Sequence, residues 1–302
     1  MTSRFPETPE PAQVDEHARS LCAGGPGTAS GVVDGAPTGC PRSGAAAGPD
    51  SAAAAHADAS RAAVYRNILN RRDVRSQFVD RPVPDEVLAR VLVAAHHAPS
   101  VGYMQPWSFI VVRSTQVKAA VHAAFVEANA QAATRFDDAR QAHYRRLKLE
   151  GIREAPLNLC ITCDRDRAGP VVLGRTHQPE MDAYSTVCAV QNLWLAARAE
   201  GLGVGWVSIV EPARLRAALA IPERIVPIAY LCLGYVSHFL PQPELEQAGW
   251  RTRLPLQDLV CEDGWGRAVA TLDPDFAARL SDWQCAVSDG TFEARLASAP
   301  PR

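Results

Sequence analysis

The chain has 302 residues, 47% of them hydrophobic and 21% charged, which is typical of a globular protein with one large domain or two small ones. Its formal net charge of −2 gives no electrostatic reason to expect nucleic acid or an anionic membrane as a partner. The sequence has no run of about 18 apolar residues that could span a bilayer, and its first residues lack a secretory pattern. We therefore expect a cytoplasmic protein.

Cysteine usage agrees with a reducing compartment. Four of the eight cysteines lie inside apolar runs: Cys160, Cys163, Cys188 and Cys232. The Cys160-x-x-Cys163 spacing invites a zinc or redox interpretation, but no second such pair or histidine pair follows at ligand spacing. The segment also alternates like a strand, so we predict buried core cysteines and no metal site.

The composition changes along the chain and suggests three parts. Residues 1–58 are rich in Ala, Gly, Pro, Ser and Thr, and they have too few large apolar side chains to offset the entropy of ordering. We predict a disordered extension there. A folded domain at 59–260 and a C-terminal extension at 261–302 follow.

The predicted elements begin with a helix from Ser60 that ends at the arginine-rich segment 71–75. A second helix begins at Asp85, after two prolines, and a turn at 98–107 then leads into a strand that ends near Val112. Later elements are one or two helices in 116–150, strands at Asn158–Cys163, Gly205–Val210 and Ile225–Leu233, and helices at Ser185–Gly201, Pro212–Leu219 and near Phe276–Trp283.

This alternation of helices and strands predicts a layered α/β or α+β domain of about 200 residues. The helix at Ser185–Gly201 is apolar almost all round, so we expect it at the centre of the core. The charged stretch 135–150 has two interpretations that the sequence leaves open. It is either a solvated helix face or a cover that closes over a site.

Two arginine clusters carry the first chemical signal. Arg71, Arg72 and Arg75 crowd the end of the first helix, and Arg251 and Arg253 follow the last strand. Guanidinium groups match phosphate oxygens in pairs, although such clusters are more often plain surface charge. The first strand is not followed by a glycine-rich dinucleotide motif, which argues against a Rossmann domain.

Five separated motifs resemble the nitroreductase superfamily, in the same order and over about residues 60–260. The resemblance implies an α+β fold with a mixed central β-sheet flanked by helices, and a homodimer with FMN at the subunit interface. It places the arginine motif, including Val74, on the phosphate and ribityl chain, Ser100 near the phosphate and ring edge, and Arg251 and Arg253 on the phosphate. The motifs are Arg71-Arg72-Asp73-Val74-Arg75, Ala98-Pro99-Ser100, Gln105-Pro106-Trp107, Gly201-Leu202-Gly203 and Arg251-x-Arg253-x-Pro255.

Three departures point to one branch of that superfamily. Asp73 stands where Ser is common, Tyr103 where Asn is usual, and Ser208 where Gly or Glu is usual. With segments 147–152 and 181–188, they resemble a branch that fragments reduced FMN with oxygen into 5,6-dimethylbenzimidazole, the lower ligand of vitamin B12, and D-erythrose 4-phosphate. The resemblance implies that Asp73 and Ser208 are catalytic, that Leu147 and Trp206 also contact the flavin, and that a separate flavin reductase supplies the reduced FMN.

Simple chemistry supports these roles but leaves alternatives open. A carboxylate beside the flavin ring can act as a general base or acid, and a hydroxyl can hydrogen-bond to it. Asp73 could instead only pair with a neighbouring arginine, and Ser208 could only bond to backbone. The whole protein could likewise be an NAD(P)H-dependent nitroreductase or flavin reductase that retains FMN, or a non-catalytic flavin-binding protein. Tyr103 and the charged stretch 135–150 favour a closed site, and hence the fragmenting branch.

Overall fold

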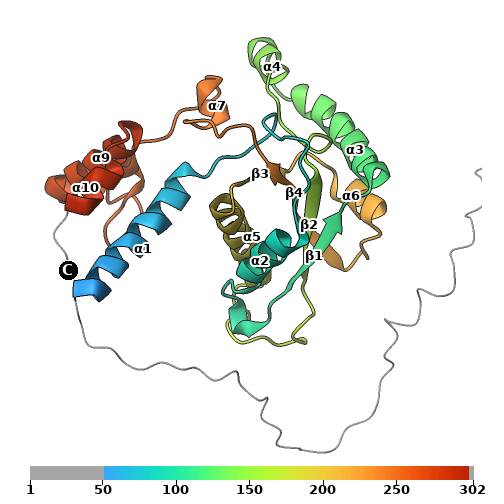
Figure 1. Cartoon of the computed structure of the whole chain (residues 1–302), viewed down its shortest axis with the longest axis horizontal. Helices are drawn as coiled ribbons and strands as arrows, with labels where there is room; N and C mark the ends of the chain where they lie inside the picture. Colours follow the sequence, from blue (N-terminus) through green and yellow to red (C-terminus); the bar gives the residue numbers. More distant parts are fainter. Residues whose placement is uncertain (1–50, 299–302) are drawn as a thin grey trace, which may run out of the picture. The chain divides into compact units, whose positions relative to one another are not determined.

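A computed structural model of the chain describes residues 51–298 (Figure 1). Of residues 1–58, which were predicted to be disordered, 1–50 lie outside the described residues and 51–58 are helical. The first described helix, α1 (Ser51–Asn70), begins earlier than the helix start predicted at Ser60. No helix among residues 51–298 is long and apolar enough to cross a membrane.

The domain is built on one four-stranded sheet in the order β1-β2-β4-β3 (Figure 1). All three strand pairings are antiparallel. The parallel part of the predicted mixed sheet is confined to a single bridge, between Asp73 and Val204. The strands are β1 (Trp107–Val112), β2 (Leu157–Asp164), β3 (Leu202–Val207) and β4 (Ile225–Tyr235).

The central strands are buried on both faces, which explains their long apolar runs. Every residue of β2 except Asp164 is buried, and Cys160 and Cys163 are both fully inaccessible. Burial raises the pKa of the Cys160 thiol to about 12, so it stays protonated and unreactive. The prediction of core cysteines in a strand is confirmed for Cys160 and Cys163, and Cys232 is buried as well. Cys188 was also expected to be buried, but it is exposed.

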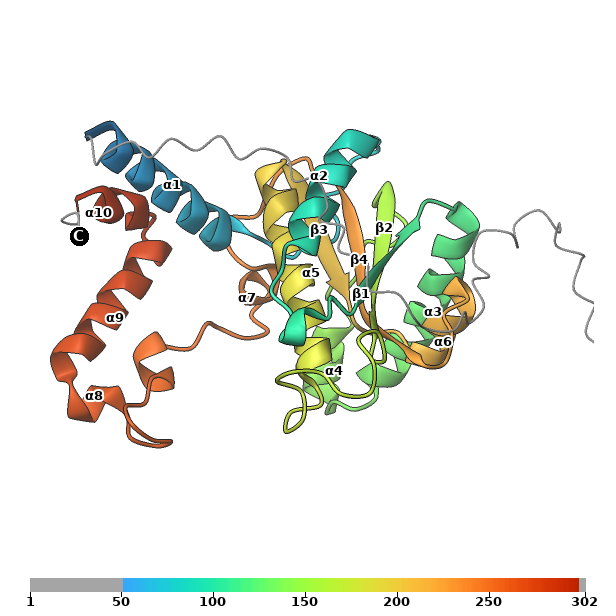
Figure 2. The same cartoon turned by 90° about the horizontal axis from the view of Figure 1, so that it is seen from below.

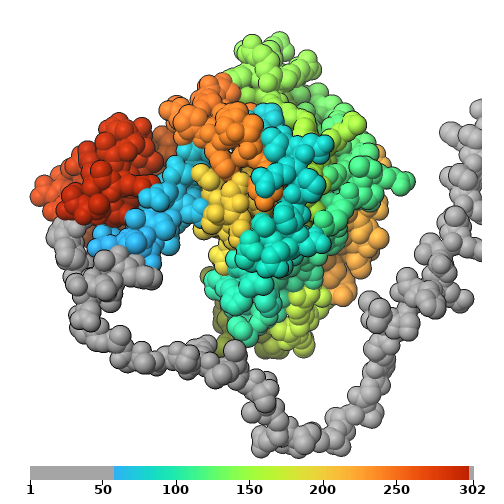
Figure 3. Space-filling model, viewed as in Figure 1, coloured from blue at the N-terminus to red at the C-terminus, as the bar shows by residue number. Residues whose placement is uncertain are grey.

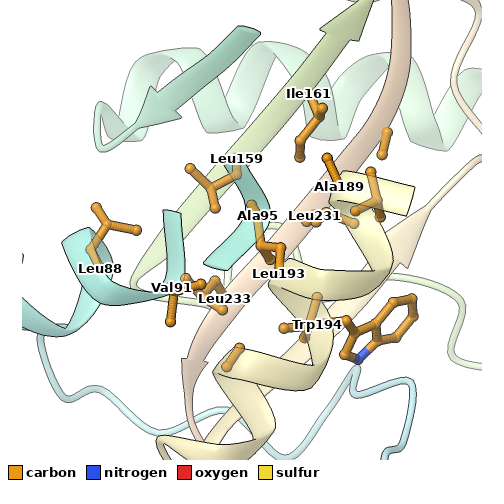
Figure 4. Close-up of a cluster of buried hydrophobic side chains, with 14 of the residues drawn as sticks. Leu88, Val91, Ala95, Leu159, Ile161, Ala189, Leu193, Trp194, Leu231 and Leu233 are labelled. Carbon is orange, nitrogen blue, oxygen red and sulfur yellow. The ribbon is translucent and has the colours of Figure 1, made fainter. Parts of the chain in front are cut away.

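Two pairs of helices cover the two faces of the sheet. On one face, α2 and α5 pack together over β2 and β4, and Figure 4 shows Leu88, Val91, Leu193 and Leu231 meeting there. On the other face, α3 and α6 enclose a second cluster that includes Phe125. The helices are α2 (Asp85–His96), α3 (Thr115–Ala133), α5 (Met181–Ala199) and α6 (Pro212–Leu219).

Helix α5 was predicted to be a fully enclosed core helix, and the structure confirms only half of that prediction. The helix begins at Met181, one turn before the predicted start, and buries Leu193 and Ala197 completely. Its opposite face is open: the exposed fractions of Tyr184 and Val187 are 56% and 41%. An apolar face of α5 is therefore left uncovered by residues 51–298.

The remaining elements lie outside the two covering layers. Helix α1 meets the C-terminal helices through the Arg66–Glu293 ion pair and through the rings of Tyr65 and Phe292, whose centroids are 5.5 Å apart (Figure 2). The helical stretch predicted near Phe276–Trp283 lies within α9. These elements are η2 (Val101–Tyr103), α4 (Asp138–Tyr144), α7 (Glu244–Gln247), η3 (Leu256–Leu259), α8 (Val269–Leu272), α9 (Pro274–Ser288) and α10 (Phe292–Ser298).

Candidate functional site

The arginine segment 71–75 lies directly across strand β3. The Val74 amide donates to the Val204 carbonyl at 3.0 Å, next to the Asp73–Val204 bridge. This close approach requires glycine in the strand, because a Cβ atom at Gly205 would overlap the Val74 carbonyl oxygen. The sequence Leu202–Val207 therefore both forms a strand and allows the backbone of segment 71–75 to pack closely against it.

Asp73 is held at two points. The Trp206 amide donates to its Oδ1 at 3.0 Å, and Arg75 Nη2 pairs with its Oδ2 at 2.8 Å. Burial raises the pKa of Asp73, while Arg75, the Trp206 amide and Arg71 act in the opposite direction. About a third of the side chain stays exposed, at 32%. Asp73 thus forms the ion pair with a neighbouring arginine that the sequence allowed, and part of its side chain remains accessible.

Two of the predicted phosphate-binding arginines use their donors inside the chain. Arg72 commits four of its five N–H donors to main-chain carbonyls, those of Leu69, Arg71, Leu240 and Pro241. Arg75 is only 8% exposed and lies between Asp73 and Glu244, with its Nη1 3.4 Å from Glu244 Oε2. In this structure both arginines shape the site rather than face open space.

Arg71, Arg251 and Arg253 are the predicted phosphate-binding arginines that remain available within residues 51–298. The Arg71 guanidinium lies 4.7 Å above the centre of the Trp194 ring. Burial lowers the pKa of Arg71; the charge of Asp73 acts in the opposite direction, and the nearby charge of Arg253 lowers the pKa further. Arg251 and Arg253 are exposed. Within residues 51–298 no hydrogen bond or ion pair engages the guanidinium of Arg71 or Arg253, so an anion would relieve their mutual repulsion.

Trp206 and Ser208 come from the same end of β3. The Trp206 ring lies 6.3 Å from the Trp194 ring, which itself supports Arg71. Ser208 directly follows the strand, is exposed, and makes no side-chain hydrogen bond within the described part of the chain. The structure does not join Ser208 to Asp73 directly.

Ser100 lies at a different place in the chain's fold. Its Oγ accepts from the Gln105 amide at 3.1 Å, and the next residue, Val101, donates to Ser185 Oγ at 3.0 Å near the start of α5. Trp194, which supports Arg71, is nine residues further along that helix, or about 13 Å at 1.5 Å per residue. One chain therefore does not bring Ser100 to the arginines.

The turn that carries Ser100 is strained. Tyr103 has a φ of 54° and Gln105 a φ of 47°, a left-handed conformation that non-glycine residues rarely adopt. Arg167 fixes this backbone through the carbonyls of Gln105 and Trp107, at 2.8 Å and 2.6 Å. The Tyr103 side chain is 83% exposed and does not close the site within one chain. Held strain of this kind is common where a ligand binds.

The charged stretch 135–150 is neither purely solvated nor detached. Phe136 and Tyr144 pack on each other with ring centroids 5.1 Å apart, and Phe136 lies 5.4 Å from Trp250. His143 Nε2 bonds to the Ala248 carbonyl at 2.7 Å. Leu147, half-buried, follows α4 by one turn. The stretch thus rests on the segment that leads to Arg251 and Arg253.

Sequence reasoning missed three residues at this site: Trp194, Glu244 and Trp250. Trp194 sits within an apolar helix pattern and was taken as core. Glu244 and Trp250 lie in a polar segment with no motif that singles them out. Among residues 51–298, the structure holds no group of three His, Cys, Asp or Glu side chains placed for a metal.

Comparison with known proteins agrees with this geometry. The nitroreductase family model matches residues 68–235, and the chain belongs to the nitroreductase family. The 5,6-dimethylbenzimidazole synthase of Rhodospirillum rubrum is 46% identical over 185 residues, which span 61% of this chain and 87% of that protein. The enzyme of the same name from Rhodobacter capsulatus is 39% identical, over 62% of this chain and 90% of that protein.

A solved structure shows the same fold. Oxidised iodotyrosine deiodinase bound to FMN and 3-iodo-L-tyrosine superposes with a TM-score of 0.53 and 20% identity, covering 67% of this chain and 98% of that one. At this identity the likeness concerns the fold alone.

Proposed function

We infer that this protein is a 5,6-dimethylbenzimidazole synthase, which fragments reduced FMN with oxygen to 5,6-dimethylbenzimidazole and D-erythrose 4-phosphate. The observation that carries the inference is Asp73, a partly exposed carboxyl that the Trp206 amide and Arg75 fix in place. It lies near Arg71 and Arg253, whose guanidinium groups have no hydrogen-bonding partner within residues 51–298. Two relatives with this activity in their names, at 46% and 39% identity, support it.

The residues present fit a flavin phosphate. The guanidinium groups of Arg71 and Arg253 have no partners in residues 51–298, and their positive charges repel each other. A phosphate would accept charge-assisted bonds from both. Arg251 would add a third cation from the same exposed segment. Arg72 and Arg75 would support the site from behind by holding the chain segments that carry these residues.

The proposed mechanism assigns separate tasks to the bound flavin and to the protein. When bound, reduced FMN would itself supply the chemistry with oxygen, so the protein would need no nucleophile. Asp73 would hold or move a proton at Oδ2, because its pKa is raised by burial. Ser208 would donate a hydrogen bond from its hydroxyl, which the chain itself leaves free in the described residues. The Trp206 amide fixes the Asp73 carboxylate in one orientation.

One experiment separates this function from the alternative of an NAD(P)H-dependent nitroreductase. The purified protein is mixed with reduced FMN in air, and the products are analysed by mass. We expect 5,6-dimethylbenzimidazole without any nicotinamide cofactor. Recovery of all the flavin as oxidised FMN, together with NAD(P)H-dependent turnover of a nitroaromatic substrate, would establish the alternative.

We further propose that the reduced FMN comes from a separate flavin reductase and that the protein works in the cytoplasm. The sequence has no glycine-rich nicotinamide motif after β1. Buried reduced thiols such as Cys160 and Cys232 suit a reducing compartment.

A first prediction concerns the phosphate. Replacing Arg71 by Ala should weaken FMN binding by about 1.5–3 kcal/mol, roughly 10- to 150-fold, because a charge-assisted bond is lost. Isothermal titration of FMN measures this, with riboflavin as the ligand that lacks the phosphate. The Arg198→Ala variant is the control, since Arg198 lies over the Phe239 ring and bonds to the Asn70 carbonyl. Equal affinity of the parent protein for FMN and riboflavin would contradict the proposed phosphate site.

A second prediction concerns assembly. We propose a homodimer in which Ser100 and the Gln105 turn of one chain complete the arginine site of its partner. The distance between these parts within one chain and the open apolar face of α5 support the proposal. Val187→Glu should lower the mass seen by light scattering to that of one chain and abolish FMN binding.

The matched control is Val126→Glu on α3. Val126 is 51% exposed, comparable to Val187, but lies on the opposite side of the sheet from α5. Its replacement should leave both mass and FMN binding unchanged. A wild-type monomer that binds FMN at full affinity would contradict the shared site.

A further inference from the structure

Arg75 joins two carboxylates that come from distant parts of the chain. Its Nη2 lies 2.8 Å from Asp73 Oδ2, and its Nη1 lies 3.4 Å from Glu244 Oε2. Arg75 is 8% exposed, and the side chain of Glu244 is 24% exposed. The Arg75 guanidinium thus forms ion pairs with two carboxylates in a largely buried environment. Glu244 lies beyond residues 68–235, the part that the family model matches.

The backbone around Glu244 is fixed at both ends of α7. Before it, Arg72 binds the Leu240 carbonyl at 3.0 Å and the Pro241 carbonyl at 2.5 Å. After it, His143 bonds to the Ala248 carbonyl at 2.7 Å. Anchors on either side give Glu244 a defined position, so its contact with Arg75 is a built feature of the fold rather than a chance surface pair.

We propose that Glu244 is a positioning residue for the reaction. It binds Nη1 of Arg75 and thereby sets how strongly Arg75 interacts with the Asp73 carboxylate. The proposal rests on the catalytic role of Asp73 inferred above. Without Glu244, Arg75 would be free to turn wholly toward Asp73 and hold it as a firm ion pair. With Glu244 in place, the positive charge of Arg75 is divided between two acids.

The charges around Asp73 give this division a measurable consequence. Arg71 and Arg75 come from its own segment, the Trp206 amide from β3, the Cys232 thiol from β4, and Glu244 from α7 beyond Arg75. Burial raises the pKa of Cys232, so that thiol stays neutral. Removal of the Glu244 charge takes away a second negative charge near Asp73, and it leaves Arg75 free to pair with Asp73 alone. Both effects lower the pKa of Asp73.

The first test uses the flavin-free protein. The titration of the Asp73 carboxyl carbon is followed by ¹³C NMR, with Asp73→Asn to assign the signal. We expect Glu244→Gln to lower the pKa of Asp73 by about half a unit, and Glu244→Asp, which keeps the charge, to leave it near the wild-type value. Glu246→Gln removes a charge from the same helix, where Glu246 accepts from the Arg253 amide instead, and should have a smaller effect.

The second test follows the reaction. The pH limb of 5,6-dimethylbenzimidazole formation that belongs to Asp73 should move down with Glu244→Gln and return with Glu244→Asp. Glu244→Ala removes the same charge without an amide to satisfy, and it replaces the Gln variant if that one does not fold. An unchanged pKa of Asp73 and an unchanged pH limb in a less stable variant would make Glu244 merely structural and overturn the proposal.

The two levels of inference fail in different ways. If Glu244→Gln shifts the pKa of Asp73 in the flavin-free protein but wild type forms no 5,6-dimethylbenzimidazole, the coupling stands and the proposed function fails. If wild type forms the product and Glu244→Gln moves neither the pKa nor the pH limb, the function stands and the role of Glu244 fails.

Discussion

Asp73→Asn is expected to stop 5,6-dimethylbenzimidazole formation by at least about 100-fold while FMN remains bound, because proton transfer by a placed side chain is worth about 10²–10⁴-fold. The amide keeps the shape of the side chain and can still accept from the Trp206 amide. It cannot hold and release a proton. FMN affinity should change little, because the free cations at the site are Arg71 and Arg253 rather than the pair that Asp73 forms with Arg75.

The loss of activity in Asp73→Asn should not come from unfolding. The pKa of Asp73 is raised in the folded state, so the stability that this group contributes is present at low pH and is lost as the pH rises through the folded pKa. At neutral pH its removal therefore costs the fold little, and Arg75 retains Glu244 as a partner. Thermal unfolding at neutral pH checks this point.

Ser208→Gly makes the companion variant. It removes a hydroxyl that no residue of the described chain engages, so we expect full stability, FMN binding and a similar loss of product. A single-turnover reaction of bound reduced FMN with air, followed by flavin absorbance and product mass, measures both variants. A wild-type yield of 5,6-dimethylbenzimidazole from either variant would show that the replaced residue is not catalytic. Loss of FMN binding would instead show that the residue has a structural role.

Gly205→Ala is expected to destabilise the protein by about 2–4 kcal/mol and to lower its melting temperature by roughly 5–15 °C. The added methyl group would overlap the Val74 carbonyl oxygen, a backbone atom that cannot move alone. The 71–75 segment must then lift from β3, which breaks the Val74–Val204 hydrogen bond and the Trp206–Asp73 bond. Stability and FMN affinity should fall together.

Gly203→Ala is the graded comparison on the same strand. A methyl group there would meet the side chains of Val236 and Val74, which can shift more easily than a carbonyl. Its effect on the melting temperature should be smaller, and the Asp73 contacts should survive. If Gly205→Ala unfolds at the wild-type temperature with unchanged FMN affinity, the segment is not seated on β3 as described.

Local patterns predicted the elements because each one depends on neighbouring residues. Alternation of apolar residues placed β2 and β4 within one or two residues of their observed bounds, and the acidic pair at Asp85 marked the start of α2. The extent of burial of α5 could not be predicted in this way. An apolar helix face looks the same in sequence whether its own chain or another one covers it.

The site was harder to predict because its contacts join distant residues. The motif 71–75 was recognised, but nothing in the sequence distinguishes Arg71 from Arg72. The Arg71 guanidinium lies over the Trp194 ring, whereas Arg72 donates to the carbonyls of Leu240 and Pro241. Glu244 has no local signal, since its importance comes from Arg75 alone. Ser100 belongs to the same list of motifs, yet only the fold shows that it lies along α5 from the arginines.

The hydrogen bonds from Arg72 to the Leu240 and Pro241 carbonyls also have a consequence for folding during synthesis. A growing chain that ends just after Tyr235 already contains every strand of the sheet, and that sheet can form. It still lacks the carbonyls that hold Arg72 and the carboxylate that holds Arg75. The last strand is thus made before Glu244 and Arg253 of the flavin site that we propose, and we expect a chain that ends at Tyr235 to bind FMN weakly or not at all.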